Sequence, residues 1–125
     1  SELRKLLEKC GLQYEVHHNR MNTYSKGMRQ KVGIAIALAK IAKVYLLDEP
    51  ASGLDPLASN ELSTLLKNLS NEGASILMAS HDIFRIRETC NRIGIIKKGE
   101  LVKEMQTSDV STKQLEKIYI DYIQN

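Results

Sequence analysis

The sequence predicts an α/β fold in which a parallel sheet is flanked by helices. A short, uninterrupted apolar run at residues 44–47 and a mainly apolar run at 74–79 alternate with segments of helical periodicity. Apolar runs of this length are typical of strands that are buried on both faces of a parallel sheet. Helix and strand signals follow one another in the order that parallel α/β proteins require. The 125 residues are enough for one hydrophobic core.

Two helices are expected before the first strand. In the first, four residues lie at helical spacing and Gly11 follows at a common stop position; they are Leu3, Leu6, Leu7 and Cys10. The second is expected over residues 26–41, with Ser25 as its N-cap. Its predicted apolar stripe consists of Met28, Val32, Ala35, Ile36 and Ala39. Because the end of this helix is apolar all round, we expect it to be buried.

Further helices are indicated by start signals after the strands. Asp55 and Pro56 predict a helix entry, because an Asp side chain caps free N–H groups and proline fits the first helical position. That helix should reach Leu69, with Gly73 in the turn before the second strand. Another helix is expected over residues 83–90 and a third strand over residues 93–96.

The last third of the sequence predicts a hairpin and a final helix. Lys98 and Gly99 indicate a tight turn into residues 100–104. Ser111 and Gln114 have the spacing of a capping box, which starts a helix. The apolar face of that helix is expected to contain Leu115, Ile118, Tyr119 and Tyr122.

Composition excludes several classes of protein. With 18 Lys and Arg against 15 Asp and Glu, the net charge of +3 is too small to require a nucleic-acid partner. The 2 cysteines, Cys10 and Cys90, have no metal-ligand spacing and are expected to be reduced thiols in a cytosolic compartment. Lys40 and Lys43 interrupt the most apolar stretch, so we expect no membrane-spanning segment.

Polar residues that follow the apolar strands are the first candidates for chemistry, because strand ends face the ligand crevice in open parallel sheets. Asp48 and Glu49 directly follow the first strand. Successive residues leaving a strand point in different directions, so one carboxylate can face a hard cation and the other a water molecule. An acidic pair before Pro50 is also a common way to begin a turn, and the pair alone does not decide between the two readings.

His81 follows the second strand after Ser80. An imidazole at this position can donate a hydrogen bond to a terminal phosphate. A single histidine at a strand end is more often a solvated loop residue, so His81 gains weight only from the other motifs.

Four short segments occur in a fixed order: YSKGMRQK at residues 24–31, VYLLDEP at 44–50, SGLD at 52–55 and SHD at 80–82. In this order they resemble the ATP-binding-cassette (ABC) ATPases, the family that powers ABC transporters. In that family the four segments correspond, in this order, to the signature motif, the Walker B strand with its catalytic glutamate, the D-loop and the H-loop. Four motifs in this order are specific evidence for the family, whereas one motif alone would be weak evidence. The resemblance implies a partial P-loop NTPase-type parallel sheet, with part of the ABC helical subdomain at the N-terminus.

The resemblance assigns roles to the strand-end residues. Asp48 would help to position Mg²⁺ through bound water, because Mg²⁺ keeps much of its hydration shell. Glu49 would polarise the attacking water, and His81 would contact the γ-phosphate. Asp48 is thus the expected metal residue, Glu49 and His81 are the expected catalytic residues, and ATP with Mg²⁺ is the expected cofactor pair.

The resemblance also implies a dimer of two ATP-binding subunits. The D-loop residues expected at the dimer interface are Ser52, Gly53, Leu54 and Asp55. The signature residues expected to bind the nucleotide of the opposite subunit are Ser25, Lys26, Gly27 and Met28. A helix N-terminus suits this task, because it offers unpaired N–H donors and a partial positive charge to phosphate.

The signature motif departs from the family pattern at two positions. Leu-Ser-Gly-Gly-Gln in the family corresponds to residues 24–28 here, where Lys26 replaces a glycine and Met28 replaces the glutamine. Lys26 could bring a charge near phosphate or could extend its ammonium group into solvent. The variant resembles those of subfamilies that export small molecules, so export is the expected direction.

No phosphate-wrapping loop of the form G-x-x-x-x-G-K-[ST] occurs in the sequence. The nearest segment, GIIKKG at residues 94–99, is followed by Glu100 and Leu101 instead of lysine and a hydroxyl residue. Closely spaced backbone N–H groups and the lysine are what hold the phosphates. We therefore expect the 125-residue chain alone to have no useful ATP affinity and no ATPase activity.

The expected domain organisation is one incomplete ABC ATPase domain. It has a helical and signature portion at residues 1–42, a core sheet portion at 43–106 and a C-terminal helix at 107–125. Expected partners are a second ATP-binding subunit, a transmembrane permease and the missing N-terminal half of the domain. The expected location is cytoplasmic, peripheral on the inner face of the membrane through the permease. The alternative is a non-catalytic α/β module that kept the family's shape and binds a protein partner.

Overall fold

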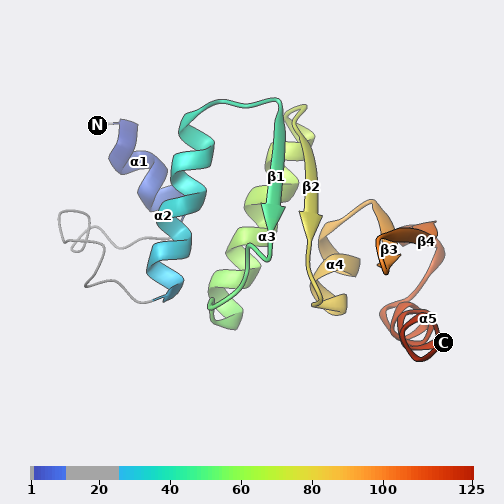
Figure 1. The fold of residues 1–125 in the computed structure, drawn as a ribbon. Coiled ribbons are helices and arrows are strands. Elements are labelled where there is room, and N and C mark those ends of the chain that lie inside the picture. Colours follow the sequence, from blue (N-terminus) through green and yellow to red (C-terminus); the bar gives the residue numbers. More distant parts are fainter. Residues whose placement is uncertain (1, 11–25) are drawn as a thin grey trace. The chain divides into compact units, whose positions relative to one another are not determined.

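The structure is a computed structural model that describes residues 2–10 and 26–125. It divides into two compact units, Ser1–Ala79 and Ser80–Asn125. Figure 1 shows the elements of both units.

The first unit combines helices with a short parallel sheet. Its helices are α1 (Glu2–Lys9), α2 (Lys26–Ala39) and α3 (Pro56–Asn71), and its strands are β1 (Val44–Asp48) and β2 (Ser75–Ala79). The two strands run parallel, with Val44 opposite Ser75 and Asp48 opposite Ala79 (Figure 1). The predicted parallel pairing of these segments is confirmed.

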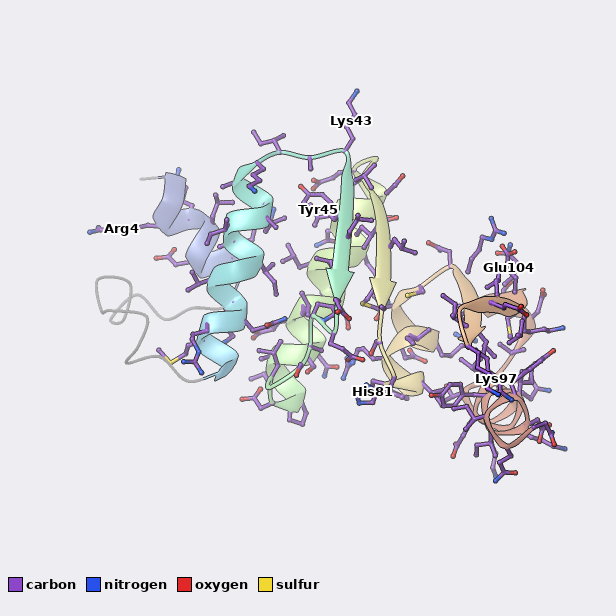
Figure 2. The ribbon with its side chains drawn as sticks, in the orientation of Figure 1. Arg4, Lys43, Tyr45, His81, Lys97 and Glu104 are labelled. Carbon is purple, nitrogen blue, oxygen red and sulfur yellow. The ribbon has the colours of Figure 1, made fainter. Side chains whose placement is uncertain are left out.

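The core of this unit lies where α2, α3 and one face of the sheet meet. Tyr45, labelled in Figure 2, is the residue of β1 in this core. The buried cluster consists of Ile34, Leu38, Tyr45, Leu62, Leu65 and Leu66. Leu47, Ile76 and Met78 pack against it from the same face of the strands.

The other face of the sheet is exposed, which contradicts the prediction of strands buried on both faces. Val44 is 58% exposed, Leu46 73% and Leu77 70%. Among the described residues, α2 and α3 supply apolar cover to the Tyr45 face alone. The prediction that these apolar runs form strands is therefore confirmed. Strands of this kind are normally covered on both faces, but here the described helices cover only one face of the sheet.

This exposed face predicts self-association of the 125-residue chain at high concentration. Removing apolar surface from water gains about 25 cal/mol per Å². Replacing both Leu46 and Leu77 by threonine should leave a monomer in light scattering, because threonine suits a strand but replaces the apolar isobutyl group by a smaller side chain with a hydroxyl. Leu57→Thr is the control, since Leu57 is 69% exposed on α3 and away from this face. A wild-type chain that stays monomeric at millimolar concentration would contradict the prediction.

Helix α2 buries a different face from the predicted stripe. Ala35 is fully buried as expected, but Ile36 is 53% exposed and Ala39 is exposed. The buried residues are Ile34, Ala35 and Leu38. The helix also ends at Ala39 rather than at residue 41, and its apolar end is not buried all round. Because the segment is apolar on every side, its own pattern cannot select the face that meets the core.

Helix α3 begins as the sequence predicts and ends two residues later than predicted. The Asp55 side chain accepts a hydrogen bond from the Ala58 N–H at 2.8 Å, and Pro56 occupies the first turn. The helix runs to Asn71, two residues beyond the predicted Leu69. Gly73 then adopts φ of +104°, a left-handed conformation that favours glycine.

The second unit contains α4 (Ile83–Thr89), β3 (Arg92–Lys97), β4 (Glu100–Gln106), the short 3₁₀ helix η3 (Thr107–Asp109) and α5 (Thr112–Gln124). Lys98 and Gly99 both have positive φ, 50° and 81°, as a tight hairpin turn requires. The turn joins β3 and β4 as an antiparallel pair, which confirms the predicted hairpin. β3 pairs with β4 in a sheet of its own, so the expected extension of the parallel sheet to a third strand is wrong.

Helix α5 starts at the predicted capping box and packs within the second unit. The Ser111 side chain accepts from the Gln114 N–H, and the Gln114 side chain accepts from the Ser111 N–H. Leu115 is 3% exposed, and Lys97 Nζ donates to the Tyr122 carbonyl at 2.7 Å (Figure 2). In the described part of the chain, no helix has the length and apolarity needed to cross a bilayer.

Candidate functional site

The acidic pair leaves β1 at the carboxyl end of the parallel sheet. Asp48 is the last residue of β1 and has an exposed side chain, whereas Glu49 is half-buried. The Glu49 N–H donates to the Ala79 carbonyl at 2.8 Å, which continues the pairing with β2 by one bond. The two carboxylates therefore leave the sheet at the edge where ligands bind in open parallel sheets.

Glu49 has an unusual backbone conformation. Its φ is +46°, in the left-handed region that residues with a side chain rarely adopt. The residue that follows is Pro50, and a residue before proline normally prefers extended backbone. The chain therefore turns sharply at Glu49, and the buried Pro50 anchors the far side of the turn.

The turn after Glu49 holds the residues expected to form the D-loop. The Ser52 N–H donates to the Glu49 carbonyl at 3.0 Å, and the Leu54 N–H donates to the Ala51 carbonyl at 3.1 Å. Gly53 adopts φ of +81°, and Asp55 caps α3. These residues form a compact turn between β1 and α3 that begins at the acidic pair.

The start of α2 contacts this turn. A Cβ on Gly27 would lie 3.0 Å from the Gly53 carbonyl oxygen and 3.5 Å from the Leu54 side chain. Glycine at position 27 thus permits a close approach that another residue would obstruct. The signature helix, which is expected to bind nucleotide, and the D-loop, which is expected at the dimer interface, lie together in the first unit.

The remaining signature residues are described in part. Ser25, expected to be the N-cap of α2, lies outside the described residues. Lys26 is the first residue of α2, and Met28 is half-buried. Their proposed contact with nucleotide stays a prediction.

Gln30 also contacts the turn after β1, although the sequence motifs did not predict it as a site residue. Its Nε2 atom donates to the Pro50 carbonyl at 2.7 Å and to the Glu49 carbonyl at 3.4 Å. It also lines a shallow open groove with Ala37, Leu46 and Asp48 among its neighbours. Gln30 lies one turn after Gly27, on the same side of a mostly apolar helix. A polar residue at this position of the sequence could have indicated a contact residue.

His81 is exposed and belongs to the second unit. The Ser80 hydroxyl accepts from the Asp82 N–H at 3.1 Å, and the Asp82 side chain caps α4 by accepting from the Arg85 N–H. These bonds fix the short segment that carries His81 (Figure 2). Its position relative to Asp48 and Glu49 stays a prediction.

The residues at the end of β1 fit a magnesium ion held mainly by water and phosphate. Within residues 2–10 and 26–125, no group of three or more His, Cys, Asp or Glu side chains forms a metal cage. Mg²⁺ usually needs only one or two carboxylates together with water and substrate phosphates. The exposed Asp48 carboxylate meets that requirement, and it is a hard oxygen donor.

Burial raises the pKa of two thiols in the described chain. Burial raises the pKa of Cys10 to about 11, against the opposing effect of the Lys9 charge, and it also raises the pKa of Cys90. Both cysteines are free, as expected. A thiol with a raised pKa stays protonated at neutral pH, so neither is suited to be a nucleophile.

Comparisons with known proteins relate the chain to ATP-binding proteins of transporters. A family profile described as "AAA domain, putative AbiEii toxin, Type IV TA system" matches residues 18–86, more than half of the chain. The lantibiotic transport ATP-binding protein SrtF of Streptococcus pyogenes is 32% identical over 123 residues, which is 98% of this chain and 52% of SrtF. The methionine import ATP-binding protein MetN 2 of Oceanobacillus iheyensis is 42% identical over 94 residues, which is 73% of this chain and 28% of MetN 2.

A solved structure extends the likeness to the fold. It is described as a dimeric post-hydrolysis state of the ATP-binding cassette MJ0796 bound to ADP and Pi. The TM-score is 0.77 at 29% identity, over 82% of this chain and 44% of that chain. The chain belongs to the ATP-binding-cassette family. The predicted α/β fold of P-loop NTPase type is thereby confirmed for this ABC chain.

The chain spans between 28% and 52% of the length of the curated ABC relatives it matches. Both solved structures of MJ0796 are described as dimeric. ATP binding is a property of the family. MetN 2 is named for import, whereas SrtF and the bacitracin transport ATP-binding protein BcrA of Enterococcus faecalis are named for transport without a direction, so the names do not select a direction.

Proposed function

We propose that this chain is part of the ATP-binding and hydrolysing subunit of an ABC transporter that couples ATP hydrolysis to export. The observation that carries the proposal is the acidic pair at the carboxyl end of β1, on a turn that the signature helix contacts through Gly27 and Gln30. An exposed Asp48 and a half-buried Glu49 give the two carboxylates different surroundings, as a metal-positioning residue and a water-polarising residue require.

Each residue has a distinct task in the proposed reaction. Asp48 positions Mg²⁺ through water, and Glu49 orients and polarises the attacking water. Bound Mg²⁺ supplies charge neutralisation between phosphate oxygens. His81 donates a hydrogen bond to the γ-phosphate. Positioning and electrostatic stabilisation account for most of phosphoryl-transfer catalysis, so no covalent step by the protein is needed.

A second copy of the ATP-binding subunit completes the proposed site. Its α2 N-terminus presents the signature residues to the γ-phosphate, because helix N-termini attract anions. These residues are Ser25, Lys26, Gly27 and Met28. The D-loop residues that lie at the proposed dimer interface are Ser52, Gly53, Leu54 and Asp55.

The subunit docks on a permease at the cytoplasmic face of the membrane in this proposal, without a nucleic-acid partner. The export direction rests on the signature variant with Lys26 and Met28. Two relatives are named for bacitracin and lantibiotic transport, and MetN 2 is named for import. The phosphate-binding loop must come from sequence outside these 125 residues.

The proposal is tested by supplying the phosphate-binding loop. The purified chain alone should release no phosphate from ATP. Fusing the loop-bearing front portion of an ABC relative such as SrtF ahead of residue 1 should produce Mg²⁺-dependent ATP turnover, measured as phosphate release. A folded fusion that binds ATP but never hydrolyses it would favour the non-catalytic interaction module. Turnover by the unfused chain would contradict the dependence on the loop.

A further inference from the structure

Helix α2 is tied to the turn after β1 at two points one helical turn apart. At the first, the Gly27 backbone lies close to the Gly53 carbonyl oxygen, 3.0 Å from where a Cβ would stand. At the second, Gln30 Nε2 donates to the Pro50 carbonyl at 2.7 Å. Residues three apart lie on the same face of a helix, so both contacts come from one side of α2.

The second contact falls on Pro50, directly after the residue whose backbone needs support, Glu49. Left-handed φ in a residue with a side chain costs about 1 kcal/mol or more, and such conformations persist only where their surroundings hold them. Glu49 has φ of +46°. Its N–H is held by the Ala79 carbonyl and its own carbonyl by the Ser52 N–H. Pro50 has no N–H, so its peptide can be held only through carbonyl oxygens.

Gln30 supplies a side-chain donor to the carbonyls of both Glu49 and Pro50. Its amide spans two successive carbonyls, those of Glu49 and Pro50, at 3.4 and 2.7 Å. Two carbonyls held by one side chain fix the plane of the peptide that follows Glu49. The orientation of that peptide determines where the Glu49 side chain leaves the backbone.

We propose that Gln30 is a positioning residue that holds Glu49 in its left-handed conformation and couples it to the signature end of α2. This role rests on the proposed function, in which Glu49 acts on the attacking water. Gln30 lies about 4.5 Å along the helix axis from Gly27, within a single rigid stretch of helix. A displacement of the α2 N-terminus by phosphate therefore moves the donor that orients Glu49 in the same subunit.

Three replacements separate this role from packing. Gln30→Met keeps the length and removes the donor, and Gln30→Glu keeps the shape but turns the donor into an acceptor facing two carbonyls. Gln30→Lys restores a donor and should act as the conservative rescue. Gln124→Met is the matched control, because Gln124 is exposed at the end of α5.

The first measurement is made on the 125-residue chain by NMR. A through-hydrogen-bond coupling should connect the Gln30 side-chain nitrogen with the Pro50 carbonyl carbon. In Gln30→Met, amide exchange of Ser52 should rise about tenfold, the effect of losing roughly one hydrogen bond's support at this turn. Exchange in the α3 core should stay unchanged, which shows that the variant is folded. Unchanged Ser52 exchange in a folded Gln30→Met chain would overturn the proposal.

The second measurement is ATP turnover of the fusion that carries the phosphate-binding loop. Gln30→Met and Gln30→Glu should lower kcat by about ten- to a hundredfold, because misplacement of a reacting group by about 1 Å costs that much. The KM for ATP should not change, since the proposed role of Gln30 is to orient Glu49 and not to bind nucleotide, and Gln30→Lys should recover most of kcat. Normal kcat in Gln30→Met, with Glu49→Gln inactive, overturns the positioning role but leaves the proposed function intact. Normal kcat in Glu49→Gln overturns the proposed function and this role with it.

Discussion

Replacing Glu49 by glutamine is expected to lower kcat of the ATP-hydrolysing fusion by at least about a hundredfold, because general-base assistance contributes about 10²- to 10⁴-fold. Glutamine has nearly the same shape, so the turn and its bond to the Ala79 carbonyl should persist. ATP affinity should change little, since the carboxylate acts on water. Single-turnover phosphate release and equilibrium ATP binding, measured on the same preparation, separate the two effects.

The matched control is Glu116→Gln, an identical chemical change at an exposed position of α5. It should leave turnover and nucleotide affinity at the values of the unmodified fusion. A Glu49→Gln fusion that retains more than about a tenth of the activity would show that another group activates the water. In that case the acidic pair would only position the metal ion and form the turn.

Leu66→Ala should be among the most destabilising single replacements in the first unit. Leu66 is 5% exposed and packs in the core that joins α2, α3 and β1. Truncating a buried leucine to alanine costs about 2–5 kcal/mol, from lost burial and from the cavity left behind. Small domains have only about 5–15 kcal/mol of stability in total, so a large part of the variant should unfold at mild urea concentration.

Urea unfolding followed by circular dichroism measures this effect as a shift of the midpoint. Leu57→Ala is the control, since Leu57 lies on the same helix but is 69% exposed, and it should change stability by no more than about 0.5 kcal/mol. Equal midpoints for the two variants would show that the α2–α3–β1 cluster does not hold the unit together.

Local signals in the sequence predicted the starts of elements well. Asp55 with Pro56 and Ser111 with Gln114 define helix starts through bonds between residues three apart, so the sequence alone contains all their partners. Lys98 and Gly99 are equally local, because two residues with positive φ suffice for the hairpin. The acidic pair was found for the same reason: it directly follows an apolar run.

Properties that depend on distant partners were not predictable in the same way. The buried face of α2 is selected by contact with the core, and the helix is apolar enough to offer several faces. The exposure of Leu46 and Leu77 depends on which other segments pack against the sheet, and an apolar run in the sequence does not show this. The left-handed backbone of Glu49 runs against the usual preference of a residue before proline. Gln30 donates to two backbone carbonyls about twenty positions away. Every residue has such a carbonyl, so the sequence does not show which of them a side chain contacts.

The absent side chain at Gly27 restricts how this sequence can vary. A methyl group there would stand 3.0 Å from the Gly53 carbonyl oxygen, and a carbonyl fixed in the main chain cannot swing aside as a flexible side chain would. Helix start and turn must therefore change together: a larger residue at position 27 is tolerated only with a compensating rearrangement around position 53. A mutational library should show this as a coupled pair, in which Gly27 accepts alanine only alongside replacements in the turn.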